Sequence, residues 1–149
     1  MTIFWLHVAS TWFMVGLIWL IQLVHYPLFL NVGSKEFRKF HNNHTLFITP
    51  LVGSVMIIEL VTSVILIFQT PHAIPNWIVI VGILLLSVIW FSTLIFQIPY
   101  HNKLSSNFDD NLIKMLIKTN WIRTICWSLR GILVLIMLNK LIETIASEI

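Results

Sequence analysis

Charged residues are scarce in this sequence. They make up 10% of the 149 residues, whereas soluble domains average about 25%. Hydrophobic residues make up 58%, so we expect an integral membrane protein with a single domain over residues 1–149. The net charge of +3 is too small and too dispersed for a nucleic-acid platform. Membrane lipids, and no nucleic acid, are therefore the expected surroundings.

Several residue types that carry chemistry in other proteins are also rare or missing. Cys126 is the one cysteine, which excludes an intramolecular disulfide and a Cys-x-x-Cys redox pair. Glu59 is the one carboxylate inside a long apolar run, so the several inward carboxylates of a ferritin-like di-iron site are missing. Without a Gly-rich phosphate loop or a Gly-x-Ser-x-Gly motif, nucleotide binding and serine hydrolysis have no support.

Long apolar runs dominate what is present. They cover residues 3–30, 46–68, 77–98 and 121–138, and each is long enough to cross a hydrocarbon core of about 30 Å. Backbone groups in lipid need internal partners, and the runs lack the alternation of a transmembrane barrel. The sequence predicts an all-α membrane protein, an antiparallel four-helix transmembrane bundle.

Basic residues predict how this bundle is oriented. The two long loops hold Lys35, Arg38, Lys39, Lys103, Lys114 and Lys118. The opposite end holds only Lys140, so the positive-inside rule places the long loops in the cytoplasm and both termini outside. The helical spacing of His41 and His44, and a cap at Asn107 or Asp109, predict that the second and fourth helices extend into the cytoplasm.

A buried ion pair is predicted near the middle of the membrane. Glu59 in the second run and Arg130 in the fourth lie at similar depths, counted at about 1.5 Å per residue. An acid at the centre of a bilayer costs about 2.5–3.5 kcal/mol, and pairing lowers that cost. The pair either fixes helix register or serves as a proton relay or substrate anchor. Glu59, Arg130 and, nearer the cytoplasmic edge, Arg123 are our candidate catalytic residues.

Histidines gather at the predicted cytoplasmic ends of the helices. His25 ends the first run, His41 and His44 share a helical face before the second, and His101 follows the third. Neutral imidazoles bind transition metals and haem iron, so these four are the candidate metal ligands. The alternative is that interfacial histidines hydrogen-bond lipid headgroups and loop carbonyls.

Three further residues are candidate cofactor contacts. His7 shares a face of the first helix with His25, because eighteen residues make five full turns. Gln97 ends the third run, four residues before His101. Trp127 lies deep in the fourth run, where it either lines a pocket for a flat ligand or packs in the core.

These residues also carry a resemblance to known proteins. The series is His25-Tyr26-Pro27, His41-x-x-His44, Glu59, Gln97-x-Pro99-x-His101 and Asn120-Trp121-x-Arg123-x-x-x-Trp127-x-x-Arg130. It resembles an uncharacterised family of small four-span bacterial membrane proteins over nearly the whole chain, and more distantly the anthrone-oxygenase-like membrane proteins. The opening Leu6-His7 followed by Trp12-Phe13 is similar to the four-helix haem-dependent protoporphyrinogen oxidase.

The resemblance implies a redox or oxygenase role in a bacterial cytoplasmic membrane, with His7 as an axial haem ligand near the outer end. The leading expectation is therefore a membrane-embedded oxidoreductase with a metal or haem near its cytoplasmic face and a lipophilic substrate. One alternative is a proton-coupled carrier or relay subunit that uses Glu59 and Arg130, and another is a structural accessory subunit. The sequence leaves open whether the chain is an enzyme, forms a homo-oligomer or joins a larger membrane complex.

Overall fold

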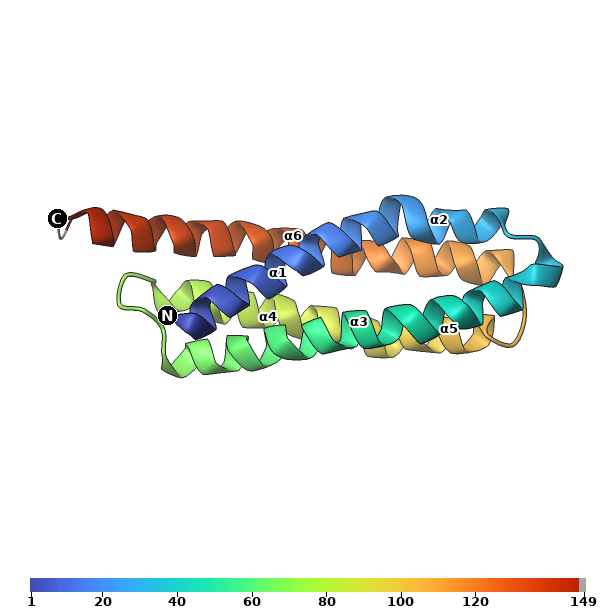
Figure 1. The fold of residues 1–149 in the computed structure, drawn as a ribbon, viewed down its shortest axis with the longest axis horizontal. Helices are drawn as coiled ribbons and strands as arrows, with labels where there is room; N and C mark the ends of the chain where they lie inside the picture. Colours follow the sequence, from blue (N-terminus) through green and yellow to red (C-terminus); the bar gives the residue numbers. More distant parts are fainter. Residues whose placement is uncertain (148–149) are drawn as a thin grey trace.

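The backbone folds into four long helical rods that run antiparallel (Figure 1). This computed structural model describes residues 1–147. The rods span Thr2–Asn31, Ser34–Phe68, Asn76–Leu104 and Asp110–Ser147, and each is long and apolar enough to cross a membrane. The predicted four-helix transmembrane bundle is thus confirmed, while the expected end of the domain at Ile149 lies outside the described residues.

The first and third rods are interrupted by wider turns. The first consists of α1 (Thr2–Leu20), the π-helical turn η1 (Ile21–His25), α2 (Tyr26–Leu28) and the 3-10 turn η2 (Phe29–Asn31). The third consists of α4 (Asn76–Ser92), the π-helical turn η3 (Thr93–Gln97) and α5 (Ile98–Leu104). The second rod, α3 (Ser34–Phe68), and the fourth, α6 (Asp110–Ser147), are continuous helices, and α3 passes through Pro50.

Both π-helical turns end two residues before a proline. In η1 the N–H of Tyr26 donates to the carbonyl of Ile21, five residues earlier, and η3 closes in the same way. Pro27 and Pro99 have no N–H, and the ring of a helical proline collides with the carbonyl four residues before it. The wider turn moves that carbonyl aside. Such turns are rare and recur at functional sites, and both lie beside the residues described below.

The two continuous helices start well before their apolar runs. Helix α6 is capped by Asp109, whose Oδ1 accepts from the N–H groups of Asn111 at 2.8 Å and Leu112 at 3.2 Å. Helix α3 follows Gly33 without a side-chain cap. Each helix begins about three turns ahead of its apolar run, which confirms the predicted extensions.

The outside of the bundle is apolar, and its inside holds both apolar and polar side chains. Large apolar side chains are exposed along all four rods, as contact with lipid requires. Three buried apolar clusters succeed one another along the bundle. They include Phe4 and Met137 at one end, Met14 and Trp127 in the middle, and Phe29 and Leu116 at the other end. The buried polar side chains lie between and beside these clusters.

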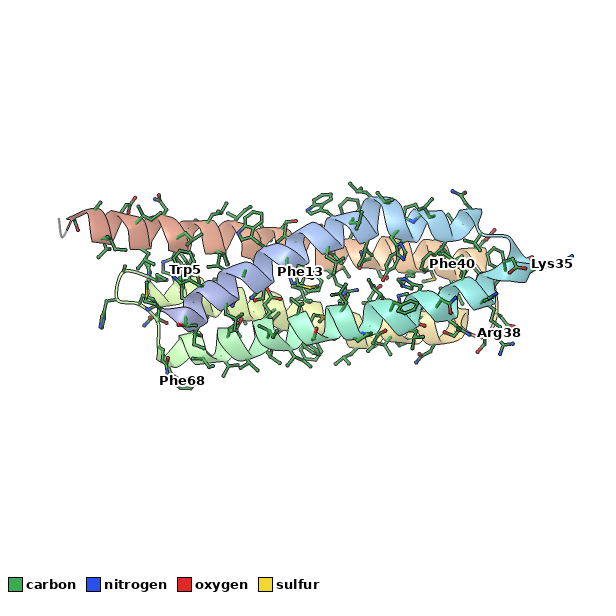
Figure 2. The ribbon with its side chains drawn as sticks, in the orientation of Figure 1. Trp5, Phe13, Lys35, Arg38, Phe40 and Phe68 are labelled. Carbon is green, nitrogen blue, oxygen red and sulfur yellow. The ribbon has the colours of Figure 1, made fainter. Side chains whose placement is uncertain are left out.

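The basic loops and the chain ends occupy opposite ends of the bundle. In Figure 1 the start of α1, the end of α6 and the turn between α3 and α4 lie at one end. Figure 2 shows Lys35 and Arg38 at the other end, far from Trp5 and Phe68. This arrangement is the one that the sequence predicts, and the cytoplasmic location of the basic end stays a prediction.

Candidate functional site

Glu59 and Arg130 form the predicted ion pair inside the bundle. The Nε of Arg130 lies 2.9 Å from the Oε1 of Glu59, and the side chains are 2% and 0% exposed. Thr11 on α1 also donates to Oε1 at 2.9 Å, and the indole N–H of Trp127 donates to Oε2 at 2.9 Å. Three donors from two other rods therefore hold the Glu59 carboxylate in place.

The Arg130 guanidinium reaches three of the four rods. Besides Glu59, it donates through NH1 to the carbonyl of Gly82 on α4 and through NH2 to the Ser63 hydroxyl on α3 at 3.2 Å. Buried charges are tolerated when they are paired and hydrogen-bonded, and this pair meets both conditions. The ion pair thus ties α3, α4 and α6 together at one level.

His7 lies beside this ion pair. Its Nδ1 is 3.0 Å from the hydroxyl of Thr62, which is one helical turn beyond Glu59. Counted by the helical rise, the sequence predicts His7 about 10 Å or more further outward than Glu59, and the contact with Thr62 shows that this prediction is wrong. Glu59 lies only nine residues before α3 ends at Phe68, and His7 lies five residues after α1 begins at Thr2, so both are near the same end of the bundle.

Trp127 connects the ion pair to Arg123. Its indole N–H is fixed by Glu59, and the guanidinium of Arg123 lies over its ring at 5.1 Å from the centroid. Arg123 also donates through NH1 to the side-chain carbonyl of Asn120 at 3.2 Å, and Asn120 in turn donates to Gln22 at 2.9 Å. Arg123 is thereby held by a ring face and an amide.

The four predicted histidines come together at the basic end of the bundle. His25 Nε2 lies 2.7 Å from His44 Nδ1, and His41 Nε2 lies 2.9 Å from His101 Nδ1. The ring centroids of His44 and His101 are 5.5 Å apart, so the two pairs are neighbours. We call these four residues, contributed by three rods, the histidine cluster.

Six of the eight ring nitrogens of the histidine cluster lie within hydrogen-bond distance of one another or of hydroxyl groups. The Tyr26 hydroxyl lies 3.0 Å from His101 Nε2, and the Ser105 hydroxyl lies 3.2 Å from His41 Nδ1. Within residues 1–147, no three His, Cys, Asp or Glu side chains are arranged to hold a metal ion. In this arrangement the cluster is a hydrogen-bonded imidazole network, and a metal or haem on these histidines stays a prediction.

A cavity of about 410 Å³ lies beside the histidine cluster, between α3 and the third rod. Its size falls in the range of about 300–1,000 Å³ that is usual for small-molecule sites. Apolar residues of α3, among them Val52 and Met56, form one wall, and His101 belongs to the opposite wall. Tyr26 and Arg123, from the other two rods, complete the lining. We call it the lateral cavity.

An apolar groove lies on the same seam between α3 and α4. It has a volume of about 200 Å³ and is lined largely by apolar residues such as Leu60, Val64 and Leu86. Trp90 lines both the groove and the lateral cavity. Along this seam the lateral cavity, which has polar side chains at its base, lies toward the histidine cluster. The apolar groove lies toward the level of the ion pair.

Three side chains that line the lateral cavity each have a buried polar atom without a hydrogen-bond partner in the described chain. Arg123 Nε, Gln97 Oε1 and Trp90 Nε1 are buried and have no hydrogen-bond partner in the part of the chain that the structure describes. Arg123 is only 4% exposed and Gln97 only 2%. Buried polar groups are nearly always hydrogen-bonded, and all three of these atoms belong to side chains that line the lateral cavity.

The predicted site residues thus divide between two levels. His7, Glu59, Trp127 and Arg130 meet at one level. The histidine cluster, Gln97 and Arg123 surround or adjoin the lateral cavity at the other. His7 and His25, which the sequence predicts on one helix face, lie at different levels.

Two residues of the second level, Tyr26 and Ser105, were not predicted. Their hydroxyls contact His101 and His41. The sequence does contain a signal for Tyr26, because this residue stands directly between His25 and Pro27.

Comparisons of this chain with models of protein families, with curated proteins and with solved structures give no match.

Proposed function

We propose that this protein binds a lipophilic small molecule in the lateral cavity and acts on it beside the histidine cluster, as an oxidoreductase-like or oxygenase-like membrane protein. One observation carries the proposal: His101 belongs both to the cavity wall and to the imidazole network. A molecule in the cavity lies within reach of an imidazole and beside apolar side chains such as Val52 and Met56. Arg123 and Gln97, with unsatisfied atoms in the same cavity, orient its polar end.

In this proposal Glu59 and Arg130 are positioning residues. The Glu59 carboxylate already accepts from Thr11, Trp127 and Arg130. Glu59 influences the lateral cavity through Trp127. It accepts the hydrogen bond of the indole N–H, and Arg123 lies over the same indole ring. The ion pair sets the place of the guanidinium and takes no part in the reaction itself.

Redox chemistry at this site requires a bound cofactor. A transition metal or haem iron on His25, His41, His44 and His101 supplies redox chemistry when it is bound. The imidazoles must then leave their present hydrogen-bonded pairs. His44 Nε2 is the first nitrogen that could bind such an iron or metal ion, since it has no hydrogen-bond partner among residues 1–147.

Filling the lateral cavity tests the binding proposal. Gly53 lines the cavity, and a Cβ built there meets no atom within 4 Å. Gly53→Leu therefore fills the cavity with little strain, and leucine also favours a helix over glycine. Gly16→Leu is the matched control, because Gly16 is exposed and equally free of neighbours.

The probe is a photoactivatable analogue of hexadecanol, incubated with the full-length protein in lipid nanodiscs. Mass spectrometry of the crosslinked protein should locate the label at lining residues such as Val52 and Met56. The label should disappear in Gly53→Leu and persist in Gly16→Leu. Equal labelling of these positions in both variants contradicts the binding proposal.

Metal and haem analysis of the purified protein, with an absorption spectrum, tests the reaction class. Stoichiometric metal or haem supports an oxidoreductase. A metal-free and haem-free protein that still binds the probe removes the redox proposal and leaves the binding proposal in place.

A second candidate, a proton relay, is favoured by a small cavity near the ion pair. This cavity has a volume of about 10 Å³ and is lined in part by His7, Ser63 and Arg130, close to the space that one water needs. Proton uptake by liposomes that contain the protein, reduced in His7→Gln, supports the relay. Liposomes no more permeable than protein-free ones contradict it.

A further inference from the structure

The charge of Arg123 is not balanced by the protein. Within residues 1–147, the ion pairs join Arg130 to Glu59 and Lys140 to Glu143, so neither involves Arg123. The partners of Arg123 are the neutral amide of Asn120, the ring of Trp127 and the neutral hydroxyl of Tyr26. A charged group so deeply buried is normally paired with an opposite charge, and a cation–π contact replaces only part of that stabilisation.

The unsatisfied atom of Arg123 belongs to a side chain that lines the lateral cavity. Its Nε has no partner among the described residues, and the side chain is 4% exposed. Guanidinium groups bind carboxylate and phosphate oxygens through short charge-assisted hydrogen bonds. The cavity therefore offers a donor and a positive charge to whatever occupies it.

The rest of the seam is suited to a hydrocarbon chain. The cavity wall on α3 is apolar around Val52 and Met56, and the apolar groove with Leu60 and Val64 lies beyond Trp90. Gln97 Oε1, unsatisfied in the described chain, accepts a hydrogen bond from a hydroxyl or a water that accompanies the head group. The seam thus combines a cationic floor with apolar walls.

We infer that the lateral cavity binds an amphiphile whose head carries an anionic oxygen, with that oxygen on Arg123 and the hydrocarbon chain directed along the α3–α4 seam. This inference rests on the proposed function and gives its substrate class. The shared chemistry is a carboxylate or phosphate on an aliphatic chain. A free fatty acid and a phospholipid are its two sources.

Competition against the photoactivatable hexadecanol tests the inference, with hexadecanoate, hexadecyl phosphate and hexadecanol as competitors. In the unmodified protein an anionic competitor should prevent labelling at a concentration at least about tenfold below that of the alcohol, as expected for a hydrogen bond to a charged group. A preference for hexadecanoate indicates a fatty acid, and a preference for hexadecyl phosphate indicates a phospholipid head.

Arg123→Met should abolish this preference, so that hexadecanoate, hexadecyl phosphate and hexadecanol compete at similar concentrations. Arg38→Met is the matched control, since Arg38 is exposed near the start of α3, away from the lateral cavity, and it should keep the preference. Arg123→Lys retains the charge without the fixed guanidinium geometry. It should keep part of the preference, which provides a folded variant if Arg123→Met proves unstable.

The outcomes separate this inference from the proposed function. Equal competition by acid, phosphate and alcohol in the unmodified protein overturns the anionic head, although the cavity still binds a lipophilic molecule. Preference for the anion that survives in Arg123→Met also overturns it. Labelling that Gly53→Leu fails to reduce overturns the proposed function itself.

Discussion

The indole N–H of Trp127 donates to Glu59 Oε2 at 2.9 Å, and the guanidinium of Arg123 lies over the same ring, 5.1 Å from its centroid. One side chain therefore joins the buried ion pair to the floor of the lateral cavity. A disturbance at Glu59 is expected to reach Arg123 through the orientation of this ring. The two polar levels of the bundle are structurally linked at this point.

Trp127→Phe tests that link. The substitution keeps an aromatic face for Arg123 but removes the donor to Glu59, which leaves a buried carboxylate oxygen short of one partner. We expect a loss of stability of about 1–3 kcal/mol, measured by thermal unfolding in detergent. We also expect weaker competition by hexadecanoate. Unchanged stability together with unchanged competition means that Trp127 is not the link.

The ion pair predicts strong coupling between Glu59 and Arg130. Glu59→Gln and Arg130→Met each leave one buried group without its opposite charge, at a cost of about 3–5 kcal/mol. The double variant should recover much of that loss. Thermal unfolding of all four proteins gives the coupling free energy directly. Simple addition of the two single losses would show that the pair contributes little as a pair.

The histidine cluster predicts that replacing either of two of its members removes a bound cofactor. His101 is bonded to both His41 and Tyr26, whereas His25 contacts His44 alone within the cluster. If metal or haem is bound, His101→Ala and His25→Ala should both lose it while the protein still inserts. His72→Ala is the control, because His72 is exposed in the turn between α3 and α4. Cofactor content that is unchanged in both cluster variants would contradict the site.

The positive-inside rule predicts which end of the bundle faces the cytoplasm. Single cysteines at Lys35 and Lys103, introduced in a Cys126→Ser background, should resist a membrane-impermeant maleimide in intact cells. A cysteine at His72, at the opposite end, should react. Labelling of Lys35→Cys without permeabilisation would reverse the orientation.

The helices and their order follow from the sequence alone. Runs such as 46–68 and 77–98 are apolar enough to span a bilayer, and backbone groups in lipid must bond within their own segment. Asp109 as a cap and the start of α3 ahead of its apolar run follow from local rules as well. These features depend on neighbours along the chain, so tertiary contacts are not needed to deduce them.

The pairing of Glu59 with Arg130 could also be predicted from the sequence, but for a different reason. The membrane restricts depth to one dimension, and a rise of about 1.5 Å per residue converts position along a helix into depth. Arg130 matched the depth of Glu59 closely enough to be chosen over Arg123. Counting residues from the cytoplasmic ends gives the wrong depth for His7. Counted from the outer ends of α1 and α3, His7 and Glu59 lie near the same level.

Only the tertiary structure decided which atoms are satisfied and which face a cavity. The sequence grouped four histidines, but the packing of three rods pairs His25 with His44 and His41 with His101. The π-helical turns before Pro27 and Pro99 depend on how each rod accommodates a proline, and no hydrophobic pattern records that choice. The lateral cavity exists because α3 and the third rod leave space beside Arg123, and such space is set by the separation of helices, which sequence spacing does not specify.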